Sequence, residues 1–208
     1  MEEKISLERA KISYFNAARA FMNDERFDDV LECLRLAGNA ALHEDQILEA
    51  NKFFANAIDY IPELKDEEEQ DYYYVFFSVL NYMCLFLKGK FEKGLNLIKK
   101  IKNRVDDTYF KENKLIYLIT DFIVAIRDKK LAYLEKVEKN FNEYQDLKEA
   151  EKKLIKYVLM IAKISIKISP SLKIEEKQYT TNDIINLSAK ISTESLLDFS
   201  KDSFYNYK

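Results

Sequence analysis

The chain has 208 residues, of which 48% are hydrophobic, and a formal net charge of -3. This length and apolar content suffice for a full core, in one domain or in one continuous array of packed units. The small net charge gives no overall preference for nucleic acid or for a membrane surface. Only three Gly and two Pro are present, too few for a β-sandwich, a β-barrel or a glycine-rich phosphate loop.

Apolar residues recur at steps of three and four in the first 61 residues, which is typical of amphipathic helices. They predict helices over residues 7–21, 27–41 and 47–61. The second of these gathers Ala-Gly-Asn-Ala-Ala around Gly38. Because Gly within a helix costs about 1 kcal/mol relative to Ala, we expect another helix to approach closely at Gly38, and we prefer this explanation to a catalytic one.

A fully buried helix and a one-sided helix are predicted in the middle of the chain. Asp66 and the three Glu residues after it form a capped, acidic helix start, which the helix dipole favours. The apolar run from Tyr72 to Leu87 predicts a helix buried on every side. After a Lys-Gly-Lys turn, a one-sided helix follows from Phe91 to Ile101, and its Gly94 stands where a small residue lets the helices of a hairpin close up.

The second half continues this alternation. Residues 115–126 are almost wholly apolar, and further helices are predicted over 131–141 and 154–168, the last capped by Asp146-x-x-Glu149. Pro170 ends the regular array, because Pro disfavours helix at the preceding residue. The predicted organisation is therefore a helical array over 1–168 and a carboxy-terminal extension over 169–208, with one or two short helices near 184–191 and 196–199 or partial disorder.

Similar residues recur just after short polar turns, at Phe27/Val30, Phe91/Gly94 and Leu131/Leu134. This recurrence is typical of stacked helical hairpins. The predicted fold is all-α: a tetratricopeptide-like solenoid of antiparallel hairpins in a right-handed superhelix, ending in a helical bundle.

Location follows from three features. Cys33 and Cys84 lie on apolar helical stripes, where a free thiol acts as a small hydrophobic group. The first residues, MEEKISLERAK, lack the pattern of a secretory signal. The richest apolar run, residues 75–87, is well short of the roughly 20 residues that cross a bilayer. We expect a cytoplasmic protein that meets membranes at most through its partners.

Catalytic signals are weak. His43 lies at a helix end beside Glu44 and Asp45, where capping or exposure to solvent is favoured over general-base catalysis. The sequence holds no His-Glu-x-x-His, paired-Cys or phosphate-loop motif. We therefore predict no enzyme activity, no metal site and no cofactor.

Two features raise the alternative of nucleic-acid binding. The lysines between Lys88 and Arg104 are capable of contacting phosphates, but a Lys-rich outer helix face is the preferred interpretation. Tyr72, Tyr73 and Tyr74 offer rings on which bases stack, but their place in an apolar helix favours packing in the core. A nucleic-acid-binding helical repeat is thus the least favoured class.

Several segments together carry a resemblance to a known family: "LERAKISYFNAARAFM", "ECLRLAGNAAL", "DYYYVFFSVLNYMCLFL", "FEKGLNLIKKI" and "FKENKLIYLITDFIVAIRDKKLAYLEKVEKNF". From Ser6 to Lys167 the chain resembles the carboxy-terminal part of the soluble NSF attachment proteins (SNAPs), adaptors that link SNARE bundles to a hexameric AAA+ ATPase. The resemblance implies a twisted sheet of helical hairpins whose concave, basic face grips a four-helix bundle.

The resemblance also implies roles for particular residues. Arg35 in "CLRLAG" and Lys111 in "FKENKL" stand at basic, SNARE-gripping positions, and Asp106 and Asp107 lie near an acidic position that contacts the ATPase. An exposed contact of this kind contributes about 0.2–1 kcal/mol, so several hairpins must act together. The alternative for Arg35 and Lys111 is an ordinary solvated helix face.

The sequence also departs from the family pattern. No cation stands near Tyr72, where a third basic position is expected, and Arg127, Lys129 and Lys130 replace much of an acidic cluster. The penultimate leucine is absent from "FYNYK", and the family's amino-terminal hairpins have no counterpart. A general tetratricopeptide-like scaffold that recruits no ATPase is therefore the alternative function.

Overall fold

The computed structural model describes residues 2–88, 90–104, 131–143, 172–174, 177–179 and 196–202, and single positions at 147, 149, 152, 155, 156, 159, 193, 194 and 204. The chain forms two compact units. The first contains Met1–Asp107 together with Ser200–Lys208, and the second contains Thr108–Phe199.

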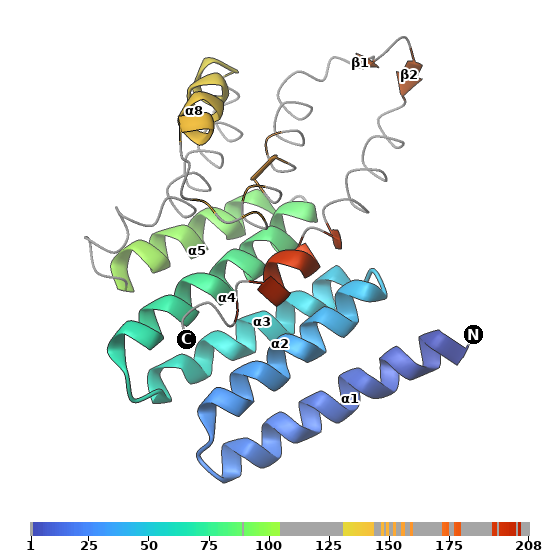
Figure 1. Ribbon diagram of the computed structural model, residues 1–208, viewed down its shortest axis with the longest axis vertical. Coiled ribbons are helices and arrows are strands. Elements are labelled where there is room, and N and C mark those ends of the chain that lie inside the picture. Colours follow the sequence, from blue (N-terminus) through green and yellow to red (C-terminus); the bar gives the residue numbers. More distant parts are fainter. Residues whose placement is uncertain are drawn as a thin grey trace. The chain divides into compact units, whose positions relative to one another are not determined.

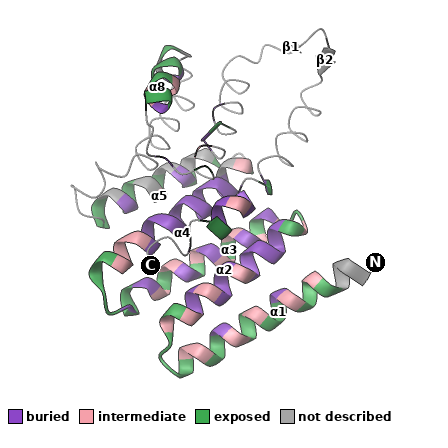
Figure 2. Cartoon of the chain, viewed as in Figure 1, coloured by how far each residue is buried: buried purple, intermediate pink, exposed green. Residues whose placement is uncertain are grey.

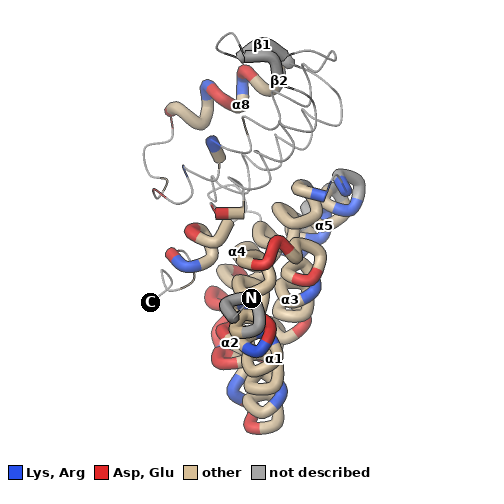
Figure 3. The backbone as a smooth tube through the Cα atoms, turned by 90° about the vertical axis from the view of Figure 1, so that its right-hand side faces the viewer, with Lys and Arg blue, Asp and Glu red and all other residues tan. Residues whose placement is uncertain are grey.

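The first unit is a stack of helices, each packed against the next in chain order (Figure 1). Figure 3 shows α1, α3 and α5 on one side and α2 and α4 on the other. The predicted all-α class and the predicted helices are confirmed here: α1 Glu2–Asn23, α2 Phe27–His43, α3 Ile47–Tyr60 with the 3-10 turn η1 Ile61–Glu63, α4 Glu67–Leu87 and α5 Phe91–Arg104.

The same turn reverses the chain after α1 and after α2. Glu25 and Asp45 adopt left-handed backbone angles, with φ of 56° and 58°. Directly after each of them, the amide of Arg26 donates to the carbonyl of Phe21 at 3.0 Å and the amide of Gln46 donates to that of Ala41 at 2.9 Å. These bonds satisfy carbonyls at the helix ends, so α1, α2 and α3 become antiparallel neighbours.

Both helical glycines permit close contact with a buried ring. A Cβ on Gly38 would collide with Phe54 of α3, at 2.7 Å from Cζ and 2.9 Å from Cδ1. A Cβ on Gly94 would lie 2.5 Å from Cε2 of Tyr82 in α4. The close approach predicted at these glycines is confirmed, and it draws α2 to α3 and α4 to α5.

Helix α4 forms much of the core. Asp66 caps its start, because its Oδ1 accepts hydrogen bonds from the amides of Glu68 and Glu69 at 2.8 and 3.1 Å. Every residue from position 73 to 85 is buried, as the purple ribbon of α4 shows (Figure 2). Among the described side chains of α1, by contrast, only Lys11 and Ala18 are buried. The core of this unit therefore lies around α2, α3 and α4.

In the second unit, α8 Leu131–Glu143 buries Leu134, Val137 and Phe141, which follow the predicted helical spacing. The strands β1 Leu172–Ile174 and β2 Lys177–Tyr179 pair antiparallel, with Leu172 opposite Tyr179. The sequence analysis did not predict this hairpin within the carboxy-terminal extension. Three-residue strands carry too little alternation to be recognised against a polar background.

The carboxy-terminal residues include a further helical segment. Residues 193, 194, 196–202 and 204 are helical, which confirms the short helix predicted near 196–199. The predicted division into an array over 1–168 and an extension over 169–208 stays a prediction; Ser200–Lys208 belongs to the first compact unit. The helices predicted over 115–126 and 184–191 lie outside the described residues.

Candidate functional site

The structure buries Arg35 in α2, where its exposed fraction is 3%. Its Nε and Nη2 atoms donate to the two carboxylate oxygens of Glu32 at 2.9 and 2.8 Å. Nη1 donates to the carbonyl of Ser200 at 3.2 Å, and the guanidinium carbon lies 4.7 Å from the centre of the Phe204 ring. The expectation that Arg35 lies on an exposed face is therefore wrong: Ser200 and Phe204, far along the sequence, cover it.

Phe204 fills an aromatic cage built by α2 and α4. Its side chain is 4% exposed. Its ring centre lies 5.2 Å from that of Tyr73, 5.6 Å from that of Phe76 and 6.2 Å from that of Phe77. We call Arg35, Tyr73, Phe76 and Phe77 the Phe204 cage. Burial, followed by the charges of nearby acidic residues, raises the pKa of Tyr73 well above its ordinary value, so its hydroxyl stays neutral.

The preferred interpretation of the tyrosine triplet, packing in the core, is confirmed for Tyr73 and Tyr74, which are 5% and 9% exposed. The cage itself was missed. The sequence feature that could have indicated the cage is Phe204, an aromatic residue in a polar stretch. It stands four residues after Ser200 and thus on the same face of a helix. Nothing in the sequence indicated which distant helices this face would meet.

Helix α5 carries an exposed basic surface, visible as blue positions in Figure 3. Lys93, Lys99 and Lys100 are exposed, whereas Gly94 and Ile101, on another side of the helix, are buried. Arg104 is also exposed, and its guanidinium lies 5.5 Å from the ring centre of Tyr74. We call Lys93, Lys99, Lys100 and Arg104 the α5 basic face. The predicted Lys-rich outer helix face is confirmed.

A cavity of about 680 Å³ opens between the α1–α2 turn and the start of α4. Arg26 and Lys65 bring positive charge to it, and Arg26 pairs with Asp29 at 2.7 Å. The negative charge is greater, so the cavity is unsuited to phosphate or other anions. Its acidic lining residues are Glu25, Asp28, Asp29, Glu63, Asp66 and Glu69.

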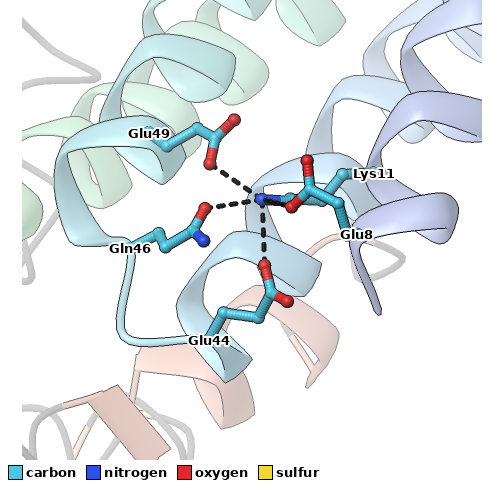
Figure 4. Close-up of polar contacts among 5 residues, drawn as sticks. All are labelled: Glu8, Lys11, Glu44, Gln46 and Glu49. Carbon is cyan, nitrogen blue, oxygen red and sulfur yellow. Dashed lines mark hydrogen bonds and ion pairs between the residues drawn. The ribbon is translucent and has the colours of Figure 1, made fainter. Parts of the chain in front are cut away.

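A buried ammonium ion joins α1 to the α2–α3 turn (Figure 4). Lys11 is 3% exposed, and its Nζ lies 2.5 Å from Glu8, 2.9 Å from Glu44 and 2.8 Å from Glu49. Nζ also donates to Oε1 of Gln46 at 2.5 Å. Only the Glu44 carboxylate is fully enclosed, since its side chain is 2% exposed whereas those of Glu8 and Glu49 are 52% and 39% exposed. We call these five residues the Lys11 cluster.

The electrostatics of the Lys11 cluster favour a permanent charge on the lysine. Burial alone would lower the pKa of Lys11, but hydrogen bonds to Glu49, Glu8 and Glu44 outweigh it and raise the pKa above the ordinary value. Across the described part of the chain, no group of three or more His, Cys, Asp or Glu residues could hold a metal ion. The contacts of the Lys11 cluster hold α1 against the α2–α3 turn.

The two cysteines, Cys33 and Cys84, are free and buried. Burial raises the pKa of Cys84 to about 12. The pKa of Cys33 is raised as well, first by burial and then by the charges of Glu32 and Asp29. His43, at the end of α2, is exposed, as predicted. None of these three groups has the activated setting of a nucleophile or general base.

We expect Cys84 to react slowly with thiol reagents in the folded protein, because the thiolate is the reactive form and burial suppresses it. At pH 8, 5,5′-dithiobis(2-nitrobenzoate) should modify Cys84 at least about 100-fold more slowly than in urea-unfolded protein. The C33S variant isolates the Cys84 signal. Equal rates in the folded and unfolded protein would contradict the burial.

The other predicted partner residues, Lys111, Asp106 and Asp107, lie outside the described residues, as do Arg127, Lys129 and Lys130. Their roles, and any surface that Lys111 shares with Arg35, stay predictions. Of the predicted site residues, the structure therefore places only Arg35.

In the described part of the chain, no helix combines the length and the apolar character that crossing a membrane requires. Comparison of the sequence with protein-family models, with curated proteins and with solved structures finds no match in any of the three.

Proposed function

We propose that this protein is a non-catalytic adaptor of the SNAP kind, in which stacked helical hairpins bind an acidic helical bundle and present it to an AAA+ ATPase. The resemblance of residues 6–167 to the SNAP family suggests this role, together with a solenoid arrangement of the hairpins and a location in the cytoplasm. The observation that carries the proposal is the α5 basic face on a firmly packed hairpin.

The α5 basic face suits an acidic helix in charge and in spacing. Lys93, Lys100 and Arg104 are separated by seven and four residues, so they lie along one stripe of α5. The close contact of Gly94 with Tyr82, about a quarter turn around the helix from this stripe, anchors α5 to the core. A cationic stripe on a rigid helix attracts an acidic partner at long range and then holds it in register.

The burial of Arg35 changes the expected contact surface. An arginine that pairs with Glu32 and lies under Phe204 adds little to a long-range field. The α5 basic face therefore replaces Arg35 as the principal cationic surface in this proposal. The adaptor would act mechanically, by transmitting force through packed hairpins, and would change no covalent bond.

Charge reversal of the α5 basic face tests the proposal. We expect the K93E/K99E/K100E variant to bind a designed acidic coiled coil at least about tenfold more weakly than the wild type at low salt. Three exposed contacts of roughly 0.5 kcal/mol each are lost, and repulsion is added. Binding is measured by fluorescence anisotropy, with circular dichroism to verify folding.

The R9E/R19E/K52E variant is the matched control, because it makes the same change in net charge at exposed positions of α1 and α3. It should retain most of the affinity. Equal losses in both variants would show that only net charge matters and would remove the α5 basic face from the site. If the wild-type protein bound mixed-sequence nucleic acid as tightly as the acidic coiled coil, and with a steep salt dependence, recognition of phosphates would be favoured instead.

A pull-down separates the SNAP-like adaptor from the general scaffold. The wild-type protein, loaded with the acidic coiled coil, is mixed with a hexameric AAA+ ATPase of the NSF type. Retention of the ATPase only in the presence of the protein supports the adaptor. Retention of the coiled coil without the ATPase supports a scaffold that recruits no ATPase.

A further inference from the structure

The Phe204 cage has the composition of a binding site for an aromatic side chain. Three rings and a guanidinium surround the Phe204 ring at centre-to-centre distances of 4.7 to 6.2 Å. Such arrangements hold an aromatic ring through edge-to-face packing and cation–π attraction. Arg35 also donates a hydrogen bond to the backbone carbonyl of Ser200. This bond does not depend on which side chain stands at that position. The cage therefore selects for an aromatic residue on a helix, four residues after an accessible carbonyl.

The members of the cage also make contacts that do not involve its occupant. Arg35 is held in place by Glu32 one turn earlier in α2, through two hydrogen bonds. The aromatic members lie within five consecutive residues of α4, and the rings of Tyr73 and Phe77 also contact one another, with centres 6.4 Å apart. These contacts are internal to each helix, so the site should persist when Phe204 leaves.

The present occupant fits imperfectly. Ser200 is fully buried, and its hydroxyl oxygen has no hydrogen-bond partner among the described residues. Burying a hydroxyl without a hydrogen-bond partner weakens the packing of this segment. A helix with a small apolar residue at this position would keep the carbonyl contact and avoid that cost. The chain's own segment is thus a weaker ligand for the cage than the same segment with a small apolar residue in place of Ser200.

We propose that the Phe204 cage is a partner-binding site, that Ser200 and Phe204 occupy it in the unbound protein, and that the partner is a helix with an aromatic residue four positions after a small apolar one. Partner binding expels Phe204 and frees the carboxy-terminal segment. The inference concerns a different surface from the α5 basic face, and its failure would leave the proposed function untouched.

The test uses chains of all 208 residues and a labelled 15-residue peptide. The peptide has the sequence of residues 194–208 with Ala in place of Ser200, ESLLDFAKDSFYNYK. The F204A chain, whose cage has lost its resident ring, should bind this peptide at least tenfold more tightly than the wild type does. The same peptide with Ala also in place of Phe204 should bind neither chain. Fluorescence anisotropy measures both affinities.

Two further variants of the same 208-residue chain sharpen the result. The K201A chain changes an exposed residue of the same segment and should behave as the wild type does. The S200A chain improves the resident ligand, so it should bind the peptide more weakly than the wild type and melt at a higher temperature. This variant removes one hydroxyl and keeps the ring in place, so it remains informative if F204A fails to fold.

Equal peptide affinity of the wild-type, F204A and S200A chains would overturn the inference. So would the absence of binding to a folded F204A chain. Binding that does not depend on the aromatic residue of the peptide would show nonspecific adhesion to α4 and would also overturn it.

Discussion

Replacing Lys11 with Met should lower the free energy of unfolding by about 3 kcal/mol, because removal of one member of a buried ion pair leaves the other uncompensated. The stranded group is the carboxylate of Glu44, whose side chain is 2% exposed. Glu8 and Glu49 are more exposed, so water screens them and they add little to the loss. Urea denaturation followed by circular dichroism measures the change.

The K11M/E44L double variant distinguishes the stranded charge from lost packing. Replacing both partners with apolar side chains removes the buried charge, so most of the lost stability should return. The K52M variant, at an exposed lysine of α3, should change stability by less than about 0.5 kcal/mol. If K11M and K52M had equal effects, the Lys11 cluster would not be a stabilising element.

The Lys11 cluster also sets a pH dependence. The folded-state pKa of Lys11 lies above its ordinary value of 10.5. Its contribution to stability is therefore complete below pH 10.5 and is lost as the pH rises through the folded-state pKa. The wild type should show this alkaline loss and K11M should not, while neither should change at neutral pH through this group.

Substitutions at Gly38 should have opposite signs in two backgrounds. Phe54 is fully buried, so F54A should cost about 3–5 kcal/mol. In the wild type, G38A forces a methyl group into the Phe54 ring, and overpacking of about 1–3 kcal/mol exceeds the helix-propensity gain of about 1 kcal/mol. In the F54A background the ring is gone, so G38A should stabilise the protein by about 1 kcal/mol.

A double-mutant cycle from urea denaturation measures this coupling. N16A, at an exposed position of α1, reports the effect of helix propensity alone and should be mildly stabilising in both backgrounds. Equal destabilisation of the wild type and the F54A chain by G38A would show that contact with Phe54 is not the reason for a glycine at position 38. The reason would then lie in the backbone conformation at that position.

Local pattern predicted most of the first unit. Apolar spacing located α1 to α5, and the Asp66 cap and the closeness at Gly38 follow from neighbouring residues and helix geometry. The sequence did not reveal that Phe54 is the group that approaches Gly38, because the choice among apolar residues of α3 depends on how two helices cross. A small residue such as Gly38 indicates where two helices come close, but it does not indicate which residue of the second helix makes the contact.

The two polar features were missed for a common reason. Arg35 and Lys11 are charged residues on amphipathic helices, and such residues are ordinarily solvated. Lys11 is buried because the turn "HEDQ" brings Glu44 and Gln46 to it, more than 30 positions away. Arg35 is buried because Ser200 and Phe204 fold back over it. Both contacts are long-range, and periodicity within a single segment carries no information about them.

The chain-order packing of the first unit has a mechanical consequence. Since each helix packs mainly against its predecessor and its successor, a small rotation at one interface reaches a distant helix only through the helices between them. We expect small angular adjustments between neighbouring helices to add up from α1 to α5. We therefore expect the stack to adjust its curvature to the surface of a partner while neighbouring helices stay in contact.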